Sequence, residues 1–144
     1  MIALPRERTI LVVEDNAADA ALVTDALDES SSAPTVLLAR GGREALQRLR
    51  DPAAGPRPHL LLLDLNLPDF SGLATLGELK ADPDLCRIPV VVLTTSKSQD
   101  EIGRCYELGA AAVLNKPMRL REYRDMFDAL EHFWLGHVRF AEGG

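Results

Sequence analysis

The stretch that decides the fold is Leu60-Leu61-Leu62-Leu63-Asp64, an unbroken apolar run that ends in a carboxylate. A strand with no polar alternation must be covered on both faces, as the strands of a parallel sheet are. Working outward, apolar runs are followed in the same way by Glu14-Asp15, by Thr94 and by Lys116. Because the carboxyl ends of parallel strands share one edge of the sheet, we expect these side chains to converge there.

Five apolar runs alternate with helix-like segments along the chain. We expect strands at residues 9–13, 35–38, 59–63, 88–93 and 111–114, and helices at residues 17–27, 43–50, 72–79, 99–108 and 119–135. Alternation on this scale predicts right-handed crossovers and one parallel sheet with helices on both faces. The fold class is therefore α/β, a doubly wound (βα)5 sheet of five parallel strands. Residues 51–58 are expected to form a loop.

The bulk composition narrows the class of protein. A chain of 144 residues with 47% apolar residues fits one domain with a buried core. The net charge of −6 argues against binding to nucleic acid, which needs clustered Lys and Arg. The sequence has no evident signal peptide and no apolar run near the roughly 20 residues of a membrane span. Cys86 and Cys105 lack a CxxC spacing, so we expect thiols and a cytoplasmic protein without a membrane partner.

The expected pocket combines carboxylates with one hydroxyl and one ammonium group. Mg²⁺ prefers oxygen ligands, and carboxylates placed close together repel one another unless a cation relieves the repulsion. An aspartate can act as a nucleophile and form an acyl phosphate. A lysine offers a compact positive charge to a phosphoryl oxygen. The residues therefore predict a pocket for a divalent cation and a phosphoryl group.

Four motifs together resemble the signature of response-regulator receiver domains. They are Val13-Glu14-Asp15-Asn16, Leu63-Asp64-Leu65-Asn66-Leu67-Pro68 with Gly72, Leu93-Thr94-Thr95-Ser96, and Asn115-Lys116-Pro117. Their order matches the family, as do the thirty positions from Asp64 to Thr94 and the twenty-two from there to Lys116. The resemblance covers residues 8–135 and implies a flavodoxin-like, CheY-like receiver fold. It leaves residues 136–144 as a short polar tail, with no sequence for an output domain.

The resemblance also implies a role for each residue of the pocket. Asp64 would be the phosphoacceptor, and Lys116 would pair with a phosphoryl oxygen while Thr94 donates its hydroxyl to the phosphoryl group. The Mg²⁺ ion would be held by the carboxylates of Glu14, Asp15 and Asp64 and by the backbone carbonyl of Asn66. The chain would not be an enzyme, because self-phosphorylation from a phosphodonor and loss of the phosphoryl group would be its only chemistry.

Two positions near the site carry further expectations. Receiver domains couple the threonine to an aromatic side chain on the fifth strand, and the matching switch position here is Val113. A valine has no ring to rotate, so the signal would leave through the loop to the fourth helix or through association. Lys116-Pro117 resembles a dipeptide whose peptide bond is cis in the family.

The last helix and the first helix suggest partners. The apolar stripe of the last helix widens at its end, and a surplus apolar patch often marks an interface. This ending resembles single-domain response regulators that work with bacterial phytochrome histidine kinases, which implies a homodimer through Met126, Phe133, Trp134 and Leu135. The kinase would dock on a surface that comprises Ala18, Asp19, Leu22, Pro117 and Met118.

Three other functions are weighed against a receiver that signals by altered association or phosphorelay. An aspartyl-phosphate hydrolase of the haloacid dehalogenase type needs a DxD motif, whereas the chain has Asp64-Leu65-Asn66. A nucleotide or flavin binder needs a Gly-rich turn after the first strand, where the chain has Glu14-Asp15-Asn16. An interaction module that works without phosphorylation is kept open by Val113.

Overall fold

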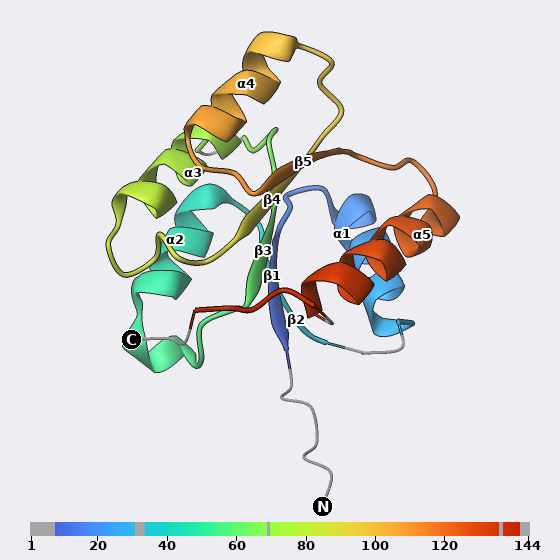
Figure 1. Ribbon diagram of the computed structural model, residues 1–144, viewed down its shortest axis with the longest axis horizontal. Helices are drawn as coiled ribbons and strands as arrows, with labels where there is room; N and C mark the ends of the chain where they lie inside the picture. The colour runs from blue at the N-terminus through green and yellow to red at the C-terminus, as the bar shows by residue number, and fades with distance from the viewer. Residues whose placement is uncertain (1–7, 31–33, 69, 136, 142–144) are drawn as a thin grey trace, which may run out of the picture.

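The computed structural model describes residues 8–30, 34–68, 70–135 and 137–141, in which strands and helices alternate (Figure 1). The strands are β1 (Thr9–Val13), β2 (Thr35–Ala39), β3 (Leu60–Asp64), β4 (Val90–Thr94) and β5 (Ala112–Asn115). The α-helices are α1 (Ala17–Asp28), α2 (Gly42–Arg50), α3 (Gly72–Ala81), α4 (Gln99–Glu107) and α5 (Leu120–Leu130). Among the described residues, no helix is both long enough and apolar enough to cross a membrane.

The five strands form one parallel sheet in the order β2-β1-β3-β4-β5. The strand that ends in Asp64 is therefore central, and the predicted fold class is confirmed. Helices α1 and α5 cover one face of the sheet, and α2, α3 and α4 cover the other (Figure 1). Every strand end that carries a predicted site residue lies at the same edge, because all the strands run in the same direction.

Alternate residues of the central strands enter two separate cores. Leu61 and Leu63 pack beneath α2, α3 and α4, whereas Leu60 and Leu62 pack beneath α1 and α5. All five residues of β3 are buried. This double burial accounts for the unbroken apolar run, since a polar side chain on either face would lose its water.

Three segments differ from the sequence-based expectation. The loop 51–58 contains a 3₁₀ helix, Pro52–Ala54. The backbone N–H of Ala53 donates a hydrogen bond to the Asp51 carboxylate at 2.9 Å. The expected last helix ends as an α-helix at Leu130 and continues as a π-helix, Glu131–Leu135. The tail is not simply polar, because the Phe140 ring packs edge-on against His59 at 5.7 Å.

Candidate functional site

The carboxyl edge of the sheet brings together Glu14, Asp15 and Asp64. One carboxylate oxygen from each lies within 4.8 Å of the other two. Glu14 directly follows β1 and Asp64 ends β3, and these strands are hydrogen-bonded neighbours. Glu14 is only 3% exposed and Asp64 only 5%, whereas Asp15 is exposed. The triad therefore has two buried carboxylates and one that faces solvent.

Lys116 reaches this cluster from the loop after β5. Its Nζ lies 2.6 Å from Glu14 Oε1, 2.9 Å from Asp19 Oδ2 and 3.2 Å from Asp64 Oδ2. The N–H of Lys116 donates to the Thr94 carbonyl at 2.9 Å, which ties its backbone to the end of β4. One ammonium group thus contacts carboxylates from two strands and from helix α1.

Burial and charge shift the pKa of both partners in the tightest of these pairs. Burial of Glu14 raises its pKa to about 7, assisted by Asp64 and opposed by Lys116. Burial alone would lower the pKa of Lys116, but its hydrogen bonds to Glu14 and Asp19 and the charge of Asp64 outweigh that effect and raise it. The ammonium form of Lys116 is therefore favoured by the surplus of negative charge around it.

Backbone N–H groups hold the remaining oxygens of the site. Glu14 Oε2 accepts from the N–H of Asn16 at 3.3 Å, and Asp64 Oδ1 accepts from the N–H of Asn66 at 3.1 Å. Thr94 is 1% exposed, and its hydroxyl oxygen accepts from the N–H of Ser96 at 3.0 Å. Because the threonine oxygen is the acceptor, its own proton is left to donate to an incoming group.

The predicted kinase surface is divided between the site and the solvent. Ala18 is exposed and Met118 is 85% exposed, whereas Pro117 and Leu22 are half-buried. Asp19 is half-buried too, and it faces Lys116, a contact that sequence reasoning missed. The available signal was its place in the first turn of the helix that follows Glu14-Asp15.

Val113 is half-buried against the core beneath α2, α3 and α4. Its backbone N–H donates to the hydroxyl of Tyr106 at 3.1 Å, so an aromatic side chain from α4 reaches β5 at this position. The Lys116–Pro117 peptide bond is trans, unlike that of the family dipeptide that it resembles.

The residues of the predicted dimer surface differ in exposure. Phe133 is 56% exposed, and its ring lies edge-on to that of Trp134 at 5.9 Å. Trp134 and Met126 are partly buried against the core beneath α1 and α5. The side chain of Leu135 lies outside the described part of the chain. Among the members of this set whose side chains the structure describes, Phe133 is the most exposed.

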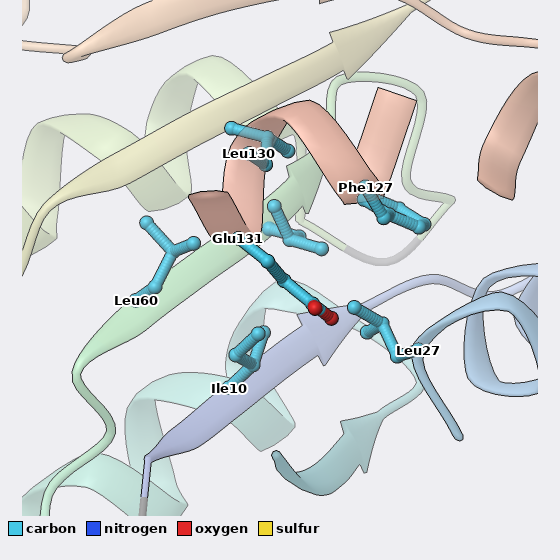
Figure 2. A pocket seen from close by; sticks show the side chains of 7 residues that line it. Ile10, Leu27, Leu60, Phe127, Leu130 and Glu131 are labelled. Atoms are coloured by element: carbon cyan, nitrogen blue, oxygen red, sulfur yellow. The ribbon is translucent and has the colours of Figure 1, made fainter. Parts of the chain in front are cut away.

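An apolar pocket lies away from the acidic edge, near the starts of β1 and β3. It is lined by Ile10, Leu27, Leu60, Leu62, Phe127, Leu130 and Glu131. Figure 2 shows the Glu131 carboxylate reaching in among these apolar side chains. The pocket contains no residue of the triad and is separate from the candidate site.

Comparisons with known proteins agree with this geometry. The family model of the response regulator receiver domain matches residues 10–128. Response regulator Rcp1 from Synechocystis sp. strain PCC 6803 is 43% identical over 134 residues, which span 91% of both chains. The crystal structure of the phosphorylated cyanobacterial phytochrome response regulator RcpA is 39% identical, with a TM-score of 0.88 over 95% of this chain and 100% of that one. The Mn²⁺-bound form of Rcp1 is 40% identical, with a TM-score of 0.84 over 94% and 99% of the two chains.

Proposed function

The chain belongs to the response regulator receiver family, and from this premise we propose that it accepts a phosphoryl group on Asp64 and later loses it to water. The observation that carries this proposal is the position of Asp64. Its Oδ2 lies 3.2 Å from Lys116 Nζ within a cluster of carboxylates at the edge of the sheet. A nucleophilic oxygen beside a fixed positive charge is suited to transfer of a phosphoryl group.

The donor set of the triad fits Mg²⁺. Glu14, Asp15 and Asp64 supply hard carboxylate oxygens within 4.8 Å of one another, and Asn66, by likeness to the family, supplies its backbone carbonyl. The Mn²⁺-bound form of Rcp1 shows that a similar protein takes a divalent cation. When bound, Mg²⁺ supplies positive charge that offsets both the crowded carboxylates and the phosphoryl oxygens.

Phosphoryl transfer would start from a phosphohistidine of a kinase. A carboxylate oxygen of Asp64 forms a bond to phosphorus while the bond between phosphorus and the imidazole nitrogen breaks, and the nitrogen keeps that electron pair. The ammonium group of Lys116 then contacts a phosphoryl oxygen in place of the Asp64 oxygen. The hydroxyl of Thr94 donates a hydrogen bond to another phosphoryl oxygen. Dephosphorylation is a separate step, in which a water oxygen bonds to phosphorus while the bond from phosphorus to the Asp64 oxygen breaks and leaves its electron pair on that oxygen. The protons of the water pass to the phosphate and to solvent. Inorganic phosphate and the free carboxylate result.

The similar proteins and the exposed residues beside the site support a proposal for the partner kinase and for the output of the signal. RcpA is a phytochrome response regulator, so we take the kinase to be a phytochrome-linked histidine kinase of the cytoplasm. Ala18 and Met118 offer exposed surface beside the site. Output would pass through a change in association at the end of α5, where Phe133 is exposed, or through a phosphorelay. Residues 8–135 would form the receiver unit.

A second candidate function is an interaction module that needs no phosphorylation. The observation that favours it is Val113, which cannot act as a rotating aromatic switch. This candidate predicts a protein that binds its partner equally well with and without an intact Asp64.

Incubation with radiolabelled acetyl phosphate and Mg²⁺ tests the phosphoacceptor. We expect about one acid-labile phosphoryl group per chain, and none in Asp64→Asn. Asp84→Asn is the matched control, because this exposed aspartate lies in the loop between α3 and β4, and it should be labelled like the wild type. Label retained in Asp64→Asn would contradict the proposal, as would many turnovers of released phosphate without a labelled protein. No label in any protein would favour the interaction module.

A further inference from the structure

Lys116 has three N–H donors and three carboxylate partners. Two of them, Glu14 and Asp64, stand at the ends of strands and belong to the acidic triad with Asp15. The third, Asp19, projects from the first turn of α1, and its Oδ2 lies 2.9 Å from Lys116 Nζ. Among the described residues, Asp19 is thus the carboxylate that holds Lys116 without belonging to the triad.

Two of the three triad carboxylates, those of Glu14 and Asp64, already have partners for both of their oxygens. Each gives one oxygen to a backbone N–H, from Asn16 for Glu14 and from Asn66 for Asp64, and the other oxygen to Lys116. A divalent cation at the triad would draw on those same oxygens. A phosphoryl group on Asp64 would turn the carboxylate that Lys116 contacts into an acyl phosphate, and the negative charge would then lie on the phosphoryl oxygens. Both events weaken the hold of the strand residues on the ammonium group.

The backbone of Asp19 is held in place independently of those events. Its backbone N–H donates to the Asn16 side chain at 3.0 Å, the cap that begins α1. Its side chain is 32% exposed, so the carboxylate lies at the mouth of the site rather than within the triad. Lys116 is only 10% exposed, so Asp19 is the more exposed partner of this contact.

We propose that Asp19 is a positioning residue for Lys116, a role that rests on the proposed phosphoacceptor function of Asp64. It keeps the ammonium group at the site once Glu14 and Asp64 engage the cation and the phosphoryl group. Without Asp19, the flexible lysine side chain would spread over more conformations. Fewer of those conformations would place Nζ on a phosphoryl oxygen.

Asp19 also has an ordinary structural explanation that must be separated from this role. An acidic residue in the first turn of a helix is stabilised by the helix dipole. That stabilisation does not involve Lys116, so it would survive removal of the lysine. A double-mutant cycle between Asp19 and Lys116 therefore distinguishes the two explanations.

The first experiment measures the maximal rate of phosphorylation by acetyl phosphate at a Mg²⁺ concentration that saturates each variant. We expect Asp19→Asn to lower this rate by about fivefold. Asp25→Asn removes the same charge from an exposed position on the same helix and should match the wild type. Asp19→Glu should recover part of the loss, since it restores the charge. An Asp19→Asn protein that is as fast as Asp25→Asn would overturn the proposal.

The second experiment needs no turnover. Urea unfolding of the metal-free wild type, Asp19→Asn, Lys116→Ala and the double variant gives the coupling between the two side chains. We expect Asp19→Asn to destabilise the wild type more than it destabilises Lys116→Ala. In Lys116→Ala the helix dipole still favours Asp19, but the contact with the ammonium group is gone and repulsion among the carboxylates opposes it. Equal effects in the two backgrounds would show that the helix dipole explains Asp19. If the wild type takes no phosphoryl group, the proposed function fails, and this cycle still shows whether Asp19 holds Lys116.

Discussion

Gly72 sets how closely α3 approaches the loop behind Asp64. A Cβ atom at this position would lie 2.6 Å from the Leu65 Cα, 2.7 Å from the Leu65 carbonyl oxygen and 2.8 Å from the Asp64 carbonyl oxygen. The Gly72 N–H also donates to the Leu65 carbonyl at 3.1 Å. Because all the crowded atoms belong to the backbone, no side-chain rotation can relieve the contact, and the loop itself would have to move.

We expect Gly72→Ala to lower the free energy of unfolding by about 1–3 kcal/mol and to weaken Mg²⁺ binding, since the displaced loop carries Asp64 and Asn66. Chemical denaturation and a Mg²⁺ titration measure the two effects. Gly103→Ala is the control, because a Cβ atom there meets nothing within 4 Å in the middle of α4. That variant should be neutral or gain up to about 1 kcal/mol. If the two variants have the same free energy of unfolding, the loop moves aside without destabilising the fold.

At this scale, the sequence indicates which residues gather but not how they pair. The sequence predicts that Asp64, Thr94 and Lys116 gather because each comes at the end of an apolar run, and parallel strands bring their ends to one edge. The contact between Asp19 and Lys116 was not found. A lysine side chain has four rotatable carbon–carbon bonds before its charged nitrogen, so the carboxylate that it contacts depends on the positions of its neighbours in space.

Helix α5 is anchored to the sheet by two aromatic side chains. Tyr123 is 0% exposed and Phe127 is 1% exposed, and their ring centroids lie 5.8 Å apart. Among the described residues, no group forms a hydrogen bond with the buried Tyr123 hydroxyl. Burial raises the pKa of Tyr123 to about 12. The ring packs well, but the hydroxyl adds a polar group that folding removes from water.

We expect Tyr123→Phe to be neutral or slightly stabilising at pH 8 and to gain stability over the wild type above pH 10. Because the pKa of Tyr123 is raised in the folded protein, this tyrosine ionises at a lower pH in the unfolded chain. The wild type therefore loses folding stability as the pH rises from about 10 towards 12. The difference should reach about 1 kcal/mol at pH 11 in urea unfolding. Phe127→Ala, by contrast, should cost about 3–5 kcal/mol at either pH. If the difference in unfolding free energy between Tyr123→Phe and the wild type does not change with pH, the hydroxyl is not buried as the structure shows.

The elements themselves follow from the sequence, because their patterns are local. The first strand was expected at residues 9–13 and lies at Thr9–Val13, and the expected order of strands and helices is confirmed. The last helix is expected at residues 119–135, and the structure is helical to Leu135, but its last turn, Glu131–Leu135, is a π-helix that the sequence does not predict. The buried Glu131 near the apolar pocket belongs to the same irregular segment (Figure 2).

The course of the tail depends on the whole molecule rather than on its own residues. Residues 137–141 leave the end of the π-helix and cross towards the α2 side of the molecule (Figure 1). Phe140 packs against His59, and the Arg8 guanidinium lies 5.1 Å from the centre of its ring. Sequence reasoning expected a polar tail, because the partners of one phenylalanine lie 81 and 132 positions away (140 − 59 and 140 − 8) and give no local signal.

Two exposed apolar side chains lie at opposite ends of α5, and they separate the two proposed surfaces. Met118, 85% exposed, precedes the helix beside the proposed phosphorylation site, whereas Phe133, 56% exposed, follows the helix in the π-helix. If association uses the end of α5, a charge at Phe133 should weaken it, because the charge would lose its water in the interface. A charge at Met118 should leave association unchanged and instead impair docking of the kinase.

Sedimentation velocity with and without beryllofluoride, which mimics the phosphoryl group, tests this division. We expect a wild type whose dimer fraction changes with the mimic, and a Phe133→Asp protein that stays monomeric at concentrations where the wild type is dimeric. Met118→Asp is the matched control and should sediment like the wild type, since it adds the same charge at the other end of α5. A dimer that is lost in Met118→Asp but kept in Phe133→Asp would place the interface near the proposed phosphorylation site instead of at the end of α5. A wild type that remains monomeric with the mimic would leave phosphorelay as the route of the signal.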